Sequence, residues 1–259
     1  MTKPQSFIAA IACLSTPIPV LAESTRVPTP RGAAIEVVAD FPTGAGPFPA
    51  LVLASGQGYH LAMPALEQTA KRLVEYGVAV YRFNWAYFAA DAKTGRPSPE
   101  LSNELEDLQT VLKIARAEPR VVQTRLSVGG KSLGSRVAWR AFSKDKSLRS
   151  GLFLTPVCSR VKKGQAGPVA EADENYPGIA LERRPLMFVS GDQDPSCAPA
   201  ILYRFAANAA GNARVAIVGG DHGYENRKLT GPAFEAARTR SINLVSLLAA
   251  SFVVESAND

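Results

Sequence analysis

Residues 130–134 read GKSLG, a G-x-S-x-G pentapeptide between a strand-like run and a helix-like run. The apolar run at 125–129 before it is typical of a strand, and residues 135–142 after it have helical spacing. A serine between two glycines at such a junction predicts a sharp strand-to-helix turn, a nucleophile elbow, with the Ser132 hydroxyl exposed at its tip. Because the pentapeptide is short enough to occur by chance, this strand–turn–helix setting is what gives it meaning.

A serine hydroxyl needs a base that accepts its proton and a third group that orients the base. The chain has only two histidines, and His222 follows a strand-like run at 215–218. Asp194 lies between Ser132 and His222 in sequence, in the turn after another strand-like run at 185–190. The sequence therefore predicts a Ser132, Asp194, His222 triad, with each residue just past the carboxyl end of a strand.

Three alternatives stay open at this stage. Asp192 lies two residues before Asp194 and could serve as the acid. His60 could serve as the base, although its place after the glycines at 56 and 58 is more typical of a pocket-lining or surface histidine. Ser132 could also occupy a tight turn for structural reasons alone.

The chain resembles the small, lidless, dienelactone-hydrolase-like branch of the α/β-hydrolases from about residue 31 to about residue 251. Five stretches in chain order carry the resemblance: LVLASGQG at 51–58, YRFNWAY at 81–87, GGKSLGSR at 129–136, GDQDP at 191–195 and DH at 221–222. The chain departs from the family at Ser55, where a histidine is usual, and at residues 155–158, which read TPVC. The acid of the family precedes a proline, and this favours Asp194 over Asp192.

The resemblance implies a serine hydrolase that acts on carboxylic esters through an acyl-enzyme. The backbone amides of Leu133 and Gln57 would form the oxyanion hole. Gly56 would lie in the pocket, and Trp85 and Tyr87 would wall the pocket or pack against the sheet. No cofactor is implied, and the partner would be a small-molecule ester.

The remaining sequence alternates strands with helices, which favours a mostly parallel sheet with helices on both faces. We expect strands at 33–41, 50–54 and 78–83, and helices at 63–76, 98–117 and 233–254. The length of 259 residues fits one α/β domain, spanning residues 23–259. Residues 159–184 have no strong periodicity and are long enough for a flap but not for a full lid domain. This predicts an open site that suits short or accessible acyl groups.

The first 22 residues are expected to be a signal peptide cleaved after Ala22. A lysine precedes an apolar run at 7–14, and prolines at 17 and 19 interrupt it before the small residues of the cleavage site. The run is too short to span a membrane, so no stable membrane insertion is expected. The mature protein would be periplasmic or secreted, and it would be cytoplasmic if this segment is not a signal.

Removal of Cys13 with the signal would leave Cys158 and Cys197. Each follows a predicted strand, and the two strands are expected to be neighbours in the sheet. The two cysteines could form a disulfide in an oxidising compartment, or they could remain buried thiols.

Charge and motifs narrow the classes of function. The net charge is +6, but the lysines and arginines are spread among acidic residues without a basic stripe interleaved with aromatics, which argues against a nucleic-acid partner. H-E-x-x-H, paired C-x-x-C and Walker-type motifs are absent from the sequence, so no metal or nucleotide site is expected. Three functions remain: a serine esterase, a non-catalytic binding protein with the same fold, and a peptidase or acyltransferase.

Overall fold

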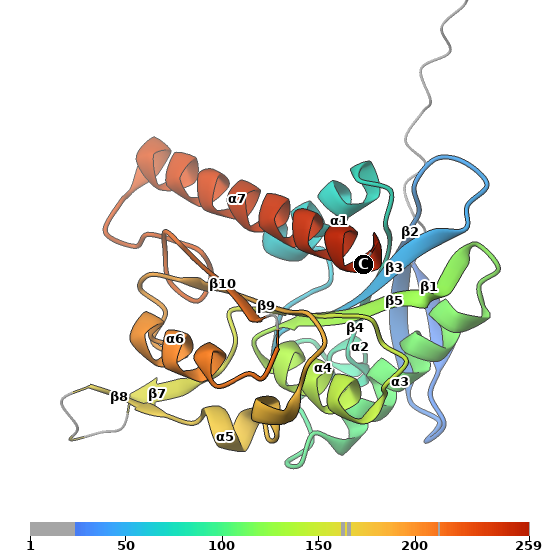
Figure 1. The fold of residues 1–259 in the computed structure, drawn as a ribbon, viewed down its shortest axis with the longest axis horizontal. Helices are drawn as coiled ribbons and strands as arrows, with labels where there is room; N and C mark the ends of the chain where they lie inside the picture. The colour runs from blue at the N-terminus through green and yellow to red at the C-terminus, as the bar shows by residue number, and fades with distance from the viewer. Residues whose placement is uncertain (1–23, 162–163, 165–166, 212, 259) are drawn as a thin grey trace, which may run out of the picture.

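A computed structural model describes residues 24–161, 164, 167–211 and 213–258 (Figure 1). The expected signal peptide at 1–22 therefore lies outside the described residues. An eight-stranded sheet runs through the molecule in the order β1-β2-β4-β3-β5-β6-β9-β10. The strands are β1 (Thr25–Pro28), β2 (Ala34–Asp40), β3 (Phe48–Ala54), β4 (Ala79–Asn84), β5 (Val121–Lys131), β6 (Gly151–Leu154), β9 (Leu186–Gly191) and β10 (Ala213–Val218). All pairs from β4 to β10 are parallel, and β2 is antiparallel to both of its neighbours.

Helices cover both faces of this sheet (Figure 1). Helices α1 (Pro64–Glu75) and α7 (Gly231–Asn258) pack together on one face. The other face carries α3 (Ser102–Ala117), α4 (Leu133–Lys144) and α6 (Pro199–Ala207), and a short helix α2 (Ala86–Ala90) follows β4. The fold is thus the mostly parallel α/β sheet that the alternation of strands and helices predicts.

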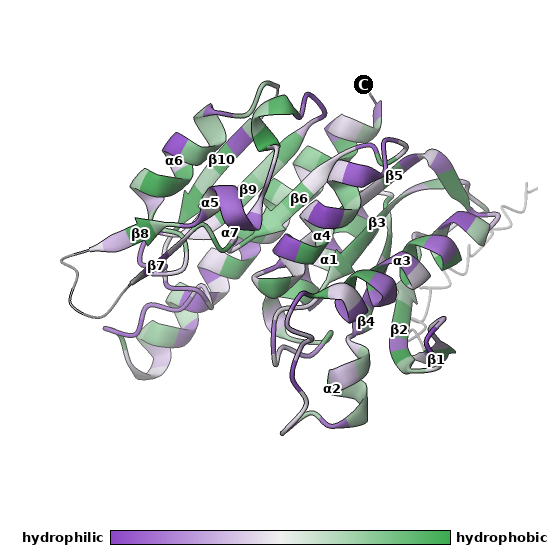
Figure 2. Ribbon diagram, turned by 90° about the horizontal axis from the view of Figure 1, so that it is seen from below, coloured by the Kyte–Doolittle hydropathy of each residue, from purple (hydrophilic) through white to green (hydrophobic). Residues whose placement is uncertain are grey.

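The core forms two layers because successive side chains of a strand point to opposite faces. In β3, Leu51 and Leu53 pack toward α1 and α7, whereas Val52 packs toward α3 and α4. Central strands are covered on both faces, so they are apolar at nearly every position and do not alternate with polar residues. Figure 2 shows this distribution, with hydrophobic strands inside and hydrophilic residues on the outer sides of the helices.

Helix α3 begins at Ser102, four residues later than the expected helix at 98–117. Ser98 instead bonds to the helix from outside: its hydroxyl donates to the Glu104 carboxylate at 2.6 Å and accepts from the Asn103 amide at 3.3 Å. Leu101 between them has a left-handed backbone with φ of 52°, which cannot continue a right-handed helix. Ser98 therefore lies before α3 and contacts its first turn through its side chain.

The segment 159–184 folds as a small flap between β6 and β9. It contains the hairpin strands β7 (Ser159–Val161) and β8 (Pro168–Ala170), a short helix α5 (Ala172–Asn175) and the 3-10 helix η1 (Ile179–Leu181). Tyr176 anchors the flap, because its buried hydroxyl bonds to the Ser135 hydroxyl at 2.7 Å and accepts from the Val157 amide at 2.9 Å. The flap is thereby attached both to the helix after Ser132 and to the loop after β6.

Helix α7 is long and apolar enough to cross a membrane by length and composition. In this fold it is a core helix: 56% of its apolar window is buried, and Val245, Ala249 and Phe252 pack toward the sheet.

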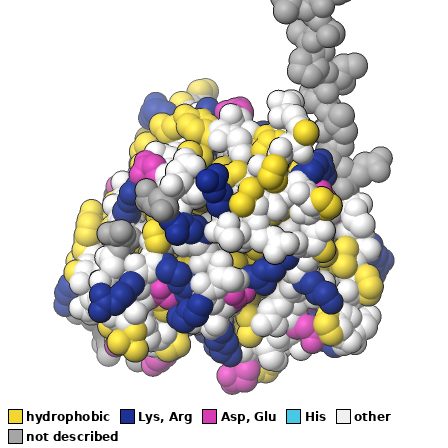
Figure 3. All heavy atoms as spheres, turned by 45° about the vertical axis from the view of Figure 1, so that its right-hand side comes forward, with side chains coloured by type: hydrophobic (Ala, Val, Ile, Leu, Met, Phe, Trp, Pro, Cys, Tyr) yellow, Lys and Arg dark blue, Asp and Glu magenta, His cyan; other side chains and the backbone are white. Residues whose placement is uncertain are grey.

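Figure 3 shows one outer face of the molecule, where Lys and Arg side chains lie among apolar and acidic ones.

Candidate active site

Ser132 lies in a strained turn between the last residue of β5 and the first residue of α4. Its φ of 54° and ψ of −117° fall outside the regions that ordinary residues prefer. A Cβ at Gly130 would collide with the backbone of Gly134, and a Cβ at Gly134 would come within 2.5 Å of the Ser55 carbonyl oxygen. Gly130 therefore lets the start of α4 lie against β5, and Gly134 lets it lie against the end of β3.

The structure brings Ser132, His222 and Asp194 together in one hydrogen-bonded row. The Ser132 Oγ lies 2.8 Å from Nε2 of His222, and Nδ1 of His222 lies 2.9 Å and 3.0 Å from the two Asp194 oxygens. With its proton on Nδ1, the imidazole donates to Asp194 and leaves Nε2 free to accept from the serine. The three residues come from the ends of β5, β9 and β10, at the carboxyl edge of the sheet, where ligands of open α/β sheets bind.

Asp194 is buried and held by two further hydrogen bonds. Its carboxylate accepts from the Ser196 amide at 2.8 Å and from the Ser190 hydroxyl at 3.2 Å, and its side chain has no exposed surface. Asp192 is exposed and accepts from the Gly220 amide at 2.7 Å, so it holds the loop that carries His222. His60 is exposed, and its Nδ1 accepts from the Ala62 amide at 3.1 Å. Of the candidate acids and bases, only Asp194 and His222 are thus in line with Ser132.

The glycine loop after β3, residues 55–58, lies against Ser132. A Cβ on Gly56 would lie 3.4 Å from the Ser132 Cβ, which is van der Waals distance, so this loop packs directly beside Ser132. Gln57 follows in the same loop, and Leu133 is the first residue of α4, where backbone N–H groups have no partner within the helix. The two amides expected to bind the oxyanion therefore come from the loop after β3 and from the first residue of α4, and both segments adjoin Ser132.

Residues 48–249 match the profile of a protein family described as an alpha/beta hydrolase domain. The chain belongs to the α/β-hydrolase family. No curated protein matches the sequence of this α/β-hydrolase.

Several solved structures share its fold. DcsB, solved in complex with a substrate analogue, is 14% identical with a TM-score of 0.69, over 92% of this chain and 100% of its own. Est1E from Butyrivibrio proteoclasticus with bound ferulic acid is 14% identical with a TM-score of 0.68, over 91% and 100%. A serine hydrolase without a lid from Xanthomonas campestris is 17% identical with a TM-score of 0.62, over 92% and 96%.

Trp85 of this α/β-hydrolase supports the glycine loop from the core. Its side chain is 1% exposed, packs edge-on against Phe83 and donates from Nε1 to the Ser55 carbonyl at 2.9 Å. The Ser55 hydroxyl donates to the Phe83 carbonyl at 2.8 Å, so Ser55 joins the loop to β4 at the position where the family usually has a histidine. Tyr87 is half-buried, and burial raises the pKa of its hydroxyl to about 12.

A disulfide joins Cys158 to Cys197, with Cα atoms 4.7 Å apart. The Ser196 carbonyl accepts from the amides of Cys158 at 2.9 Å and Ser159 at 2.8 Å. Because the Ser196 amide also bonds to Asp194, the disulfide and these bonds fasten the turn at Asp194 to the loop after β6.

We expect the double substitution Cys158→Ala with Cys197→Ala to lower the free energy of unfolding by about 2–4 kcal/mol, because the unfolded chain regains the freedom that the cross-link removes. Denaturant unfolding without reductant measures the change. A reductant should lower the stability of the wild type and leave that of the double variant unchanged. An unfolding midpoint equal to that of the oxidised wild type would contradict the prediction.

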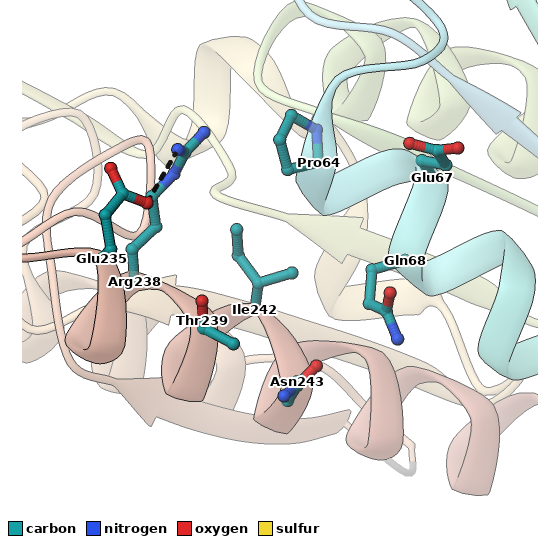
Figure 4. A pocket seen from close by; sticks show the side chains of 8 residues that line it. All are labelled: Pro64, Glu67, Gln68, Glu235, Arg238, Thr239, Ile242 and Asn243. Carbon is teal, nitrogen blue, oxygen red and sulfur yellow. Dashed lines mark ion pairs between the residues drawn. The ribbon is translucent and has the colours of Figure 1, made fainter. Parts of the chain in front are cut away.

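A separate hollow of about 290 Å³ lies between α1 and α7 (Figure 4). Its lining is polar apart from Pro64 and Ile242, and Glu235 and Arg238 form an ion pair across 3.8 Å on one side of it. The residues that line it do not include Ser132, Asp194 or His222.

Within the described residues, no group of three or more His, Cys, Asp or Glu side chains is placed to hold a metal ion.

Proposed function

We propose that this protein is a serine hydrolase that acts on carboxylic esters through an acyl-enzyme. The observation that carries the proposal is the continuous row from the Ser132 hydroxyl through both nitrogens of His222 to the buried Asp194 carboxylate. Membership of the α/β-hydrolase family supports hydrolysis as the class of reaction. Est1E, which carries bound ferulic acid, and the lidless serine hydrolase share the fold.

In the proposed mechanism, His222 Nε2 accepts the Ser132 proton as Oγ attacks the ester carbonyl. Asp194 holds the imidazole in the required tautomer and stabilises the imidazolium that forms. The amides of Leu133 and Gln57 donate to the oxyanion of the tetrahedral intermediate, and loss of one such donor typically slows acyl transfer on the order of 10²- to 10³-fold. The imidazolium then protonates the leaving alcohol, and water releases the acyl group with His222 again as the base.

We propose short or accessible acyl groups as the substrates. The side chain of His222 is 30% exposed, so solvent reaches the base in the absence of a cover. The flap is short, and Tyr176 ties it to α4 and to the loop after β6. These features support an open site and do not favour a long acyl chain that needs an enclosed tunnel.

Intact-mass spectrometry of the purified protein after treatment with a fluorophosphonate tests this function. We expect one covalent adduct, together with hydrolysis of p-nitrophenyl acetate or butyrate faster than that of longer esters. Folded protein that gives neither an adduct nor ester hydrolysis would contradict the proposal and favour a binding protein. Product analysis with added alcohol or amine acceptors separates hydrolysis from acyl transfer.

Export is part of the proposal, and the disulfide supports it because such bonds persist in oxidising compartments. Intact-mass spectrometry of the protein, purified from the cells that produce it, tests whether it is exported. We expect a chain that starts after Ala22 and lacks two hydrogens at Cys158 and Cys197. A chain that retains residues 1–22 would argue for the cytoplasm.

A further inference from the structure

Lys131 is a buried cation beside the triad for which the proposed mechanism has no role. It is 2% exposed, although it carries an ammonium group at the end of β5. Lysine is almost never buried to this extent without a partner, because its charge must leave water. It also directly precedes Ser132 in the sequence, so its position is tied to that of the nucleophile.

The ammonium group contacts the loop that carries the base. Its Nζ donates a hydrogen bond of 2.7 Å to the backbone carbonyl oxygen of His222, 91 residues away in the sequence. The aromatic rings of Tyr59 and Tyr224 lie beside it, with centroids 4.8 Å and 6.0 Å from Nζ, and add cation–π attraction. One side chain therefore links the nucleophile turn to the base residue itself.

Few other contacts hold the backbone of His222. Within the described residues, the backbone of His222 makes one hydrogen bond, the one from Lys131. The side chain of His222 bonds to Ser132 and Asp194. The neighbouring residues are fixed separately: the Gly220 amide donates to Asp192, and the Gly223 amide donates to Asp221. Lys131 thus supplies the hydrogen bond to the backbone of His222, whereas Ser132 and Asp194 bond to its imidazole.

We propose that Lys131 is a positioning residue for the ester hydrolysis proposed above, holding the His222 carbonyl so that Nε2 stays at the Ser132 hydroxyl. The inference rests on that proposed function. Lys131 itself does not touch the reacting atoms. It acts through His222, so its loss should affect the rate of acyl transfer and leave substrate binding nearly unchanged.

Burial makes this cation costly to the folded state. Desolvation lowers the pKa of Lys131 to about 8, against the opposing attraction of the Asp194, Asp221 and Glu225 carboxylates. The two aromatic neighbours stay neutral, because burial raises the pKa of Tyr59 to about 12 and that of Tyr224 well above its usual value. A side chain kept for stability alone would not be expected to carry such a charge here.

The test is Lys131→Met in the full chain, with Lys113→Met on the exposed surface of α3 as the matched control. We expect kcat for a short p-nitrophenyl ester to fall about 10- to 100-fold, the size expected for loss of a hydrogen bond to a charged group. KM should stay within about twofold, as expected when binding is unaffected. Tm at pH 7 should be equal to or higher than that of the wild type, because a buried charge is removed. The control should match the wild type in all three.

The pH dependence gives a readout that a purely structural lysine would not show. Wild-type kcat should decline as the pH rises through about 8, where Lys131 loses its charge, and Lys131→Met should lack this decline. The folded-state pKa lies below the ordinary value of 10.5, so the unfolded chain holds more protons between these two values. Wild-type stability therefore rises with pH in this window, and the Tm advantage of Lys131→Met should shrink between pH 7 and pH 10.

Two results would overturn the role of Lys131. One is a Lys131→Met variant whose kcat stays within twofold of the wild type. The other is a loss of kcat that accompanies a fall in Tm of more than about 5 °C, because the lysine would then act through stability. If Lys131→Met does not fold, Lys131→Gln decides, since its amide retains an N–H donor without the charge: it should keep part of the activity and lack the decline near pH 8. A wild type that neither hydrolyses esters nor reacts with a fluorophosphonate would instead refute the proposed function itself.

Discussion

Ser132→Ala should lower kcat/KM for a short p-nitrophenyl ester by about 10⁴- to 10⁶-fold, because alanine has no hydroxyl to attack the carbonyl. The remaining rate would come from the oxyanion amides and from substrate binding. Steady-state kinetics with the purified variant measures the loss. The fluorophosphonate adduct should also disappear, which intact mass would show in the same preparation.

Folding of the Ser132→Ala variant needs a control, because this position has a φ of 54°. Alanine is strained there as serine is, so Tm should stay close to that of the wild type. Ser135→Ala in α4 is a comparison that removes a nearby hydroxyl, bonded to Tyr176, without removing the nucleophile. The Ser135 hydroxyl also donates to the Ser132 carbonyl at 2.6 Å, so Ser135→Ala should lower the activity far less than Ser132→Ala does. Activity retained in Ser132→Ala would rule out Ser132 as the nucleophile.

Asp194→Asn should lower kcat by about 10³- to 10⁴-fold, because an amide cannot stabilise the imidazolium and favours the wrong tautomer of His222. The same substitution at Asp192 is the matched control, two residues away. The Asp192 carboxylate accepts from the Gly220 amide, and an asparagine oxygen can still accept that bond, so the activity should change by less than about tenfold. Kinetics of the two variants side by side measures the difference.

The reverse order of effects would assign the acid to Asp192 and contradict the geometry at His222. Circular dichroism and Tm should show that both variants fold. In the wild type, the Ser190 hydroxyl and the Ser196 amide donate to the two buried oxygens of Asp194. The asparagine of Asp194→Asn has only one oxygen to accept these bonds, so some loss of stability is expected in that variant alone.

Much of the site could be predicted from the sequence because its signals are local. The two glycines around Ser132 are part of the pentapeptide itself, and the apolar run before it and the helical run after it are read from neighbouring residues. The order of Ser132, Asp194 and His222, each after a strand, indicated the parallel sheet and the edge at which the three would meet. These features depend on chain geometry over a few residues, and a single sequence contains them.

The tertiary structure decided the contacts between residues far apart in the chain. Asp192 and Asp194 lie in one turn, and only the packing of β9 beside β10 shows that one accepts from Gly220 and the other faces His222. Trp85 was expected either in the pocket wall or against the sheet, and its burial under Ser55 places it in the core.

Lys131 had a visible signal, a charged residue inside the elbow motif, but its bond to the His222 carbonyl spans 91 residues. Likewise, the Cα separation of Cys158 and Cys197 depends on the loops after β6 and β9 meeting at one edge. The sequence by itself therefore determined the fold class and the residues of the row, because periodicity and turn chemistry are local properties. The hydrogen-bond partners, the disulfide and the burial of the lysine were decided by the tertiary structure, because they depend on the order and register of the strands.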